Sequence, residues 1–284
     1  MTASRLDAAV TAGMAVTVEG VSFAYEGGAD SVSALDDVSV DLPAGSSTAL
    51  LGATGAGKTT LLQVVRGLDP PAAGRVLLDG VGPGEARYAA LQREVGLVFQ
   101  RPERQLFAAT ARDDVAFGPR ALGWPEEEVA AAVAAAMEQV GLPPGEYGGR
   151  HPYSLSGGEQ RRLALAGVLA LRPRLLLLDE PFVSLDPASR ESLLEVLDHL
   201  SSGGVTLLLA THDVDLAWRL CERLVVLREG RVALAGPWDL TPAGQRLLAE
   251  NRLRPPFLAG LWQRLGRDPA AAPRTLAEAA EALA

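Results

Sequence analysis

The sequence predicts an α/β fold with a mostly parallel sheet core, and three observations carry that prediction. Short apolar runs alternate with helical segments over much of the chain, which is typical of parallel strands covered by helices on both faces. A glycine-rich loop joins one apolar run to a helix. A second apolar run ends in two adjacent acids, at the strand end where open α/β sheets bind ligands.

The predicted elements of the first hundred residues follow in order. Residues 1–13 are expected to form a flexible tail, and residues 14–51 are strand-like, with glycine and proline between the runs. A helix is predicted over 59–67, because the segment ends at a glycine. A strand and turn are predicted over 75–80, and a buried strand over 95–99.

The next segment changes character and then the alternation returns. Residues from 101 to about 149 are rich in Ala and Glu, and we expect a helical subdomain over about 101–165. The 14–236 segment is therefore interpreted as one domain, followed by a Pro- and Ala-rich C-terminal extension over 237–284 with short helices. The later predicted elements are a strand at 174–178, a helix at 187–200, a strand at 205–210, a helix from about 213 and a hairpin over 223–235.

Composition excludes several classes of protein. The chain has 284 residues and a net charge of -9, so it is long enough for a large core, and its acidity argues against a nucleic-acid-binding surface. Its single cysteine, Cys221, excludes an internal disulfide. No apolar run approaches the ~18 residues of a membrane span, and the N-terminus lacks a signal-peptide pattern. We expect a cytoplasmic protein whose membrane role, if any, runs through a partner.

The glycine-rich loop carries the chain's only lysine. Lys58 lies in Gly52-Ala53-Thr54-Gly55-Ala56-Gly57-Lys58-Thr59, which matches the G-x-x-x-x-G-K-[ST] pattern of a phosphate-binding loop. A compact ammonium fits beside a β-phosphate, whereas a planar guanidinium does not. A plain glycine-rich turn is the alternative, but the strand before the loop and the helix after it give the required context. The expected phosphate-binding residues are Gly52, Thr54, Gly55, Ala56, Gly57, Lys58, Thr59 and Thr60.

Two acids end the second apolar run. Leu175-Leu176-Leu177-Leu178 runs into Asp179 and Glu180. Asp179 is expected to support Mg²⁺ while Thr59 ligates the ion directly, and Glu180 is then placed to polarise the attacking water. Either acid alone would be read as an ordinary strand-end residue, and the phosphate loop upstream favours the functional interpretation.

A second helix start has the chemistry of a phosphate site. In Leu155-Ser156-Gly157-Gly158-Glu159-Gln160, the serine is a common N-cap. Exposed N–H groups, a hydroxyl and a positive helix end also bind phosphate. One chain with two such helix starts suggests a dimer that encloses the nucleotide.

At this point the chain resembles the ATPases of ABC transporters, over about residues 14–235. The resemblance implies a P-loop NTPase fold with a mostly parallel sheet core, an antiparallel β subdomain and a helical subdomain. It implies ATP and Mg²⁺ as cofactors. The 155–160 segment matches the signature motif of the family, which implies that Ser156, Gly157, Gly158 and Glu159 bind the γ-phosphate of ATP held by the opposite subunit.

Four further positions match the family in its order. Tyr25 matches the aromatic residue that stacks on adenine, although a packed strand aromatic is the commoner reading of a tyrosine alone. Gln100 matches the glutamine that contacts Mg²⁺ and senses the transmembrane partner. Asp186 matches the loop that crosses the dimer interface, and His212 matches the histidine that contacts the γ-phosphate. The implied catalytic residues are Lys58, Glu180 and His212, and the implied metal ligands are Thr59, Gln100 and Asp179.

A narrower resemblance concerns the ATPases of energy-coupling factor transporters, which import cobalt, nickel, biotin and other vitamins. It rests on residues 99–107, on 113–119 and on the tail 253–261. Gln105 matches a second glutamine of that group, near the groove for the transmembrane coupling helix, and the alternative is a solvated polar residue. The tail is similar to an extension that helps to hold the two ATPases together. Thr54 departs from the Pro, Asn or Ser of many relatives and leaves the required glycines intact.

The sequence therefore predicts the ATP-hydrolysing subunit of an ABC importer, of the energy-coupling factor type for cobalt, nickel or a vitamin. Its implied partners are a second ATPase subunit, identical or not, a transmembrane coupling protein and a separate substrate-binding membrane protein, without nucleic acid. It would lie at the cytoplasmic face of the membrane. The alternatives are a soluble ABC ATPase acting on DNA or ribosomes, or the ATPase of another importer or exporter class. The DNA-repair coiled-coil insertion and a second ATPase domain are both missing from this sequence.

Overall fold

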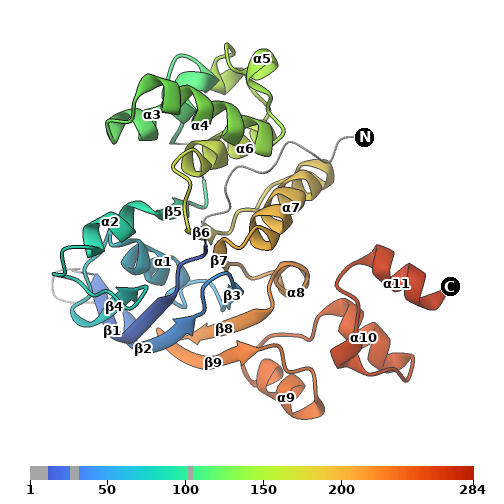
Figure 1. Cartoon of the computed structure of the whole chain (residues 1–284). Coiled ribbons are helices and arrows are strands. Elements are labelled where there is room, and N and C mark those ends of the chain that lie inside the picture. The colour runs from blue at the N-terminus through green and yellow to red at the C-terminus, as the bar shows by residue number, and fades with distance from the viewer. Residues whose placement is uncertain (1–11, 26–31, 102–104) are drawn as a thin grey trace. The chain divides into compact units, whose positions relative to one another are not determined.

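The computed structural model describes residues 12–25, 32–101 and 105–284 (Figure 1). Of the predicted tail 1–13, residues 1–11 lie outside the described residues, and the predicted boundary at 236/237 stays a prediction. The chain divides into two compact units that interleave along the sequence. Unit 1 comprises residues 1–15, 43–45 and 84–207, and unit 2 comprises residues 16–42, 46–83 and 208–284.

Unit 2 contains a three-stranded antiparallel sheet, as predicted. Its strands are β1 (Val16–Tyr25), β2 (Val32–Leu42) and β4 (Ala73–Leu78), in the order β2-β1-β4. β1 buries Val16, Val18 and Val21, and the register shifts between Val18 and Val21. The extra residue there lets the apolar side chains stay on one face, because a bulge resets the two-residue alternation.

Unit 2 also holds a parallel strand pair and a hairpin. The fully buried β3 (Ser47–Leu51) pairs in parallel with β8 (Arg223–Arg228), which pairs antiparallel with β9 (Arg231–Pro237). The hairpin turns at Glu229 and Gly230, whose φ angles are 53° and 76°, as a type I′ turn requires. Helix α1 (Lys58–Arg66) follows β3 and ends at Gly67, with φ 78°.

Unit 1 holds the second apolar run. The parallel pair β5 (Val95–Val98) and β6 (Leu175–Asp179) is buried along its whole length. The six-stranded sheet has the order β5-β6-β7-β3-β8-β9, and the division between the units falls inside β7 (Thr206–Ala210). The parallel pairing of β3 with β8 and of β5 with β6 in this sheet confirms the predicted fold class. Helix α2 (Tyr88–Arg93) is an element that the sequence analysis did not predict.

Helices make up the rest of unit 1 (Figure 1). Helices α3, α4 and α6 pack together and bury Val115, Met137 and Leu163. Thr110 caps α3 through its hydroxyl, and Pro125 precedes three glutamates in the first turn of α4. The helices are α3 (Ala111–Ala121), α4 (Glu126–Gln139), α5 (Pro144–Tyr147), η2 (Pro152–Ser154), α6 (Gly157–Leu169) and α7 (Pro187–Ser202).

The C-terminal extension of unit 2 forms short helices, as the sequence predicts. They are α9 (Pro242–Glu250), α10 (Phe257–Arg264), η3 (Pro269–Ala271) and α11 (Leu276–Leu283), and they follow α8 (Val214–Leu220) and the β8–β9 hairpin. Within the described ranges, no helix has the length and apolarity that crossing a membrane requires.

Candidate functional site

The glycine-rich loop of unit 2 joins the end of β3 to the start of α1. Lys58 is 8% exposed, and its ammonium donates to the carbonyls of Gly52 and Ala53 at 2.8 Å and 3.3 Å. These bonds curl the loop around the ammonium. Thr59, the next residue, is exposed at the helix start, where backbone N–H groups and the helix dipole favour an anion.

Two glycines of the loop are required by the packing behind it. A Cβ at Gly52 would lie 2.5 Å from the Leu227 carbonyl, and one at Gly57 would lie 2.5 Å from the Ala34 carbonyl. Gly55 has φ 80° with open space around it, so its glycine is needed for backbone conformation. The hairpin turn supports the loop, because the Gly230 N–H donates to the Ala56 carbonyl at 3.2 Å.

Tyr25, the predicted adenine-stacking residue, lies beside this loop. The residue is 46% exposed, and its ring packs edge-on against Phe23, with 5.0 Å between centroids. Its hydroxyl lies 3.0 Å from the Thr60 hydroxyl and donates to Gln63 at 3.3 Å. An exposed ring whose hydroxyl is tied to the phosphate-loop helix is well placed to receive a base.

His212 lies in a short connection that is fixed at both ends. The Thr211 N–H donates to the Leu50 carbonyl at 3.1 Å, and the Asp213 N–H donates to the Thr211 hydroxyl at 3.1 Å. Asp213 is the N-cap of α8, with a side chain that accepts two backbone N–H groups. His212 itself is exposed, as a histidine that meets a phosphate must be.

The predicted signature segment starts α6 in unit 1. Ser156 accepts from the Glu159 N–H at 3.3 Å, and Glu159 accepts from the Ser156 N–H at 2.8 Å, a complete capping box. The pKa of the Glu159 carboxyl is lowered, chiefly by that bond from the Ser156 backbone. The sequence is compatible with a plain N-cap and with a phosphate site at Ser156, and the structure shows the N-cap.

Gly157 and Gly158 in this segment differ in the space around them. A Cβ at Gly158 would lie 2.2 Å from the Ser189 hydroxyl, whereas one at Gly157 would meet nothing within 4 Å. Ser189 donates to Asp186, the N-cap of α7, at 2.6 Å, and this bond is the main cause of the lowered pKa of Asp186. Packing explains Gly158, while Gly157 leaves room for an approaching ligand.

The two acids follow β6 in the same unit. Asp179 is 5% exposed at the strand end. Glu180 has φ 47°, a left-handed conformation that costs a residue other than glycine roughly 1 kcal/mol or more and clusters at functional sites. This backbone geometry supports the interpretation of Glu180 as a functional residue.

Arg161 is a residue that the sequence analysis missed. It is 7% exposed on α6, and it donates to the carbonyls of Pro181, Val183 and Gln100. One guanidinium therefore joins the signature helix to Gln100 and to the loop after Glu180, because its five donors can reach three carbonyls at once. The residues that Arg161 contacts lie 20 to 61 positions away in the sequence, and contacts at such separations produce no periodic sequence pattern.

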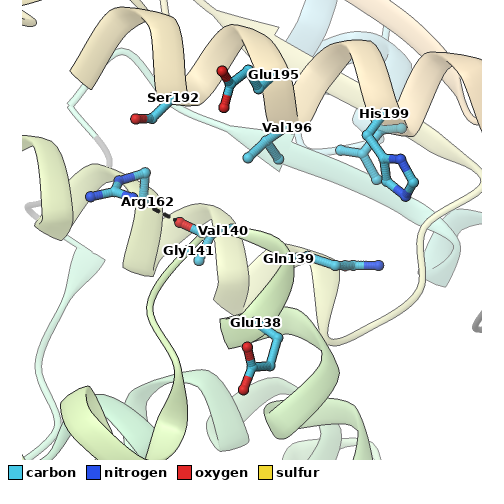
Figure 2. Close-up of a pocket in the computed structure, with 10 residues that line it drawn as sticks. Glu138, Gln139, Val140, Gly141, Arg162, Ser192, Glu195, Val196 and His199 are labelled. Carbon is cyan, nitrogen blue, oxygen red and sulfur yellow. Dashed lines mark hydrogen bonds between the residues drawn. The ribbon is translucent and has the colours of Figure 1, made fainter. Parts of the chain in front are cut away.

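A cavity of about 320 Å³ opens elsewhere in unit 1, and Figure 2 shows its lining. None of the predicted site residues lines it. Its arginine, Arg162, donates to the Val140 carbonyl at 3.0 Å. The lining residues are Glu138, Gln139, Val140, Gly141, Arg162, Ser192, Glu195, Val196, His199 and Leu200.

The structure therefore assembles the predicted residues in two groups, one in each unit. In unit 2 the phosphate loop connects to Tyr25 through Thr60 and to the Thr211–Asp213 connection through β3. In unit 1 Arg161 joins Gln100 to the loop that follows Asp179 and Glu180. The remaining unit 1 residues are Ser156, Gly157, Gly158, Glu159 and Asp186.

Comparisons with known proteins identify the family of the chain. Residues 35–183 match the family model described as ABC transporter. The nickel import ATP-binding protein NikO of Rhodobacter capsulatus is 46% identical over 86% of this chain and 97% of its own length. The cobalt import ATP-binding protein CbiO of the same organism is 42% identical over 92% of each.

A solved structure is also similar. The structure of cbiO1 from Clostridium perfringens, described as part of the ABC transporter complex cbiONQ, has a TM-score of 0.71 and 32% identity, and the match covers 88% of this chain and 95% of that one. Family model, relatives and fold agree with the phosphate loop, so the chain belongs to the ABC transporter family, as one of its ATPase subunits.

Proposed function

We propose that this ATPase energises an importer of the energy-coupling factor type whose solute is nickel or cobalt. The observation that carries the proposal is the extent of the likeness. Identity of 46% and 42% to nickel and cobalt import subunits extends over 86% and 92% of this chain. The likeness therefore extends beyond the ATP-binding motifs that all ABC ATPases share. A vitamin is the alternative solute.

The chemistry proposed is hydrolysis of ATP at a site that needs two copies of the motifs. Lys58 and the loop N–H groups hold the phosphates, Tyr25 stacks on adenine, and His212 contacts the γ-phosphate. Glu180 polarises the water. Ser156, Gly157, Gly158, Glu159 and Asp186 act on nucleotide held by a second ATPase subunit, and the open space at Gly157 supports that role.

The residues proposed to hold Mg²⁺ fit the ion chemically. Thr59, Gln100 and Asp179 offer hydroxyl, amide and carboxylate oxygens, the hard donors that Mg²⁺ prefers. Among the described residues no cluster of three or more His, Cys, Asp or Glu side chains could hold a metal ion. The proposed site is one that phosphate oxygens of the nucleotide would complete. The ion supplies neutralisation of phosphate charge.

The membrane partner is proposed to dock beside Gln105. Phe107 and Phe117 are 62% and 54% exposed and meet edge-on with 4.8 Å between centroids. The segment is fixed, because the Phe107 N–H donates to Asp114 at 2.8 Å and the Tyr153 hydroxyl donates to the Leu106 carbonyl at 2.6 Å. Exposed aromatics on a fixed segment are typical of an anchor for a partner helix.

The experiment is metal uptake in cells that express the chain with its membrane partners. Cells with the parent protein should accumulate labelled nickel or cobalt, and a Glu180→Gln variant should not. Biotin uptake is measured in parallel, and ATP hydrolysis is measured with and without DNA. Uptake of biotin but of neither metal would overturn the proposed solute. DNA-stimulated hydrolysis without uptake would overturn the proposed importer function.

A further inference from the structure

Helix α8 begins directly after His212 and carries no residue that the proposed chemistry uses. Its N-cap, Asp213, is the neighbour of His212, and it accepts from the N–H groups of Asp215 and Leu216, both at 3.1 Å. Asp213 is joined to His212 by one peptide bond, so a shift of α8 that carries its N-cap would also displace the His212 backbone. The start of α8 therefore holds one end of the His212 connection, and the bond from Thr211 to Leu50 holds the other.

The C-terminal extension holds the first turn of α8. Arg254 donates to the Asp215 carboxylate at 2.6 Å, and the Phe257 backbone N–H donates to the same carboxylate at 2.5 Å. The Arg254 side chain is 70% exposed, so the ion pair alone contributes little stability. Two donors from different residues on one carboxylate nevertheless fix the start of α10 against the start of α8.

The extension also holds the last turn of α8. Arg274 donates to the carbonyls of Trp218 and Cys221 at 2.6 Å and 2.7 Å, and its guanidinium lies 4.4 Å from the Trp218 ring centroid. The Trp218 indole donates to the Pro273 carbonyl at 3.2 Å. The last carbonyls of a helix lack partners within it and carry negative charge, so a half-buried arginine is a strong cap there.

A third group reinforces this end. The Trp238 indole, directly after β9, donates to the same Cys221 carbonyl at 2.9 Å and packs edge-on against Trp218, with 5.5 Å between centroids. The extension thus holds α8 at both ends, through contacts between residues that lie 17 to 56 positions apart in the sequence.

We propose that the C-terminal extension clamps α8 and so sets His212 in position for the γ-phosphate, with Arg274 and Asp215 as positioning residues. The proposal rests on the proposed role of His212. An extension needed only for attachment or stability would stabilise the fold without affecting the chemical step. The clamp instead makes turnover depend on these contacts while nucleotide affinity does not, because the phosphate loop and Tyr25 bind ATP without the extension.

Variants of the full-length protein separate these possibilities. Arg274→Met keeps an apolar stem on Trp218 and loses both carbonyl bonds, and Arg274→Lys restores one charged donor. The matched control is Arg267→Met, because Arg267 lies in the same extension, donates to the Ala282 carbonyl at 2.9 Å and stacks on Trp262 at 5.2 Å. These contacts of Arg267, with Ala282 and Trp262, both lie inside the extension.

The expected result is a fall in kcat of about five-fold or more for Arg274→Met with KM unchanged, partial recovery for Arg274→Lys, and the parent kcat for Arg267→Met. The chain has three histidines, so the His212 signal can be assigned in a histidine-labelled NMR spectrum by comparison with His212→Ala. That signal should move in Arg274→Met and stay in Arg267→Met. Asp215→Asn, which keeps an acceptor for Phe257, should give a smaller change in the same direction.

Failure of the clamp and failure of the proposed function are distinguishable. If His212→Ala hydrolyses ATP at the parent rate, the role of His212 is wrong. If His212→Ala is inactive but Arg274→Met keeps the parent kcat and the parent His212 signal, the clamp is wrong. Equal losses of kcat in Arg274→Met and Arg267→Met, at equal loss of thermal stability, would reduce the extension to a structural support and also overturn the clamp.

Discussion

The hydroxyl of Tyr25 lies 3.0 Å from the hydroxyl of Thr60, so the residue expected to stack on adenine is joined to the helix that follows the phosphate loop. The parts of the chain that we propose to bind the two ends of a nucleotide therefore contact each other. Tyr25 belongs to an antiparallel sheet strand and Thr60 to α1, and both lie in unit 2.

This contact can be tested by separating the hydroxyl of Tyr25 from its ring. Tyr25→Phe removes the hydroxyl that contacts Thr60 and Gln63 and so loosens the ring. ATP affinity should then fall by about 2- to 10-fold, equivalent to roughly 0.5–1.5 kcal/mol. Tyr25→Ala also removes the stacking surface and should bind more weakly than Tyr25→Phe. The measurement is a titration with a fluorescent ATP analogue, and equal affinities of the two variants would show that the ring does not stack.

The phosphate loop gives the sharpest test of the nucleotide site. Lys58→Arg keeps the charge but should nearly abolish ATP binding or turnover, because the ammonium is enclosed by the carbonyls of Gly52 and Ala53 and a guanidinium is larger and planar. Binding and hydrolysis are measured together. Near-parent values for both would remove Lys58 from phosphate binding.

Glu180 should separate binding from chemistry. Glu180→Gln keeps the shape of the side chain and the left-handed backbone, so nucleotide should still bind, whereas turnover should be lost without the carboxylate. ATP should then accumulate a closed dimer, seen by size-exclusion chromatography. Parent-rate hydrolysis by this variant would exclude Glu180 from the mechanism.

The adjacent glycines of the signature segment form a matched pair. Gly158→Ala places a methyl group 2.2 Å from the Ser189 hydroxyl and should lower the free energy of unfolding by about 1–3 kcal/mol. Gly157→Ala has open space around it and should leave thermal stability intact while weakening ATP-dependent dimerisation. Gly157→Ala that dimerises with ATP like the parent would show that no phosphate approaches there.

Coupling to the membrane partner is tested at Gln105. Gln105→Ala should leave hydrolysis by the isolated subunit roughly intact, because the residue is exposed and lies outside the proposed chemistry. In the reconstituted complex it should impair uptake, or the stimulation of hydrolysis by the partner, since a coupling residue acts only when both sites are engaged. Full uptake by this variant in proteoliposomes would show that Gln105 is a solvated polar residue without a role in coupling.

The parts of the fold that the sequence predicts are those with local causes. The hairpin turn at Glu229 and Gly230 follows from a glycine between two apolar runs, because glycine adopts positive φ without strain, and the helix starts follow from their caps. Arg161 and Arg274 could not be predicted, because each makes its contacts with carbonyls 20 or more residues away. Every residue carries a backbone carbonyl, so the sequence does not reveal which residues such an arginine contacts.

The enclosed ammonium of Lys58 also sets how this protein responds to reagents that attack amines. It is the only lysine side chain in 284 residues, and it is 8% exposed inside the phosphate loop. Acylating reagents, lysine-directed crosslinkers and enzymes that acetylate lysine therefore find a single side chain to modify. Acylation there would remove the charge that the loop encloses, so for this chain we expect modification of lysine to abolish hydrolysis.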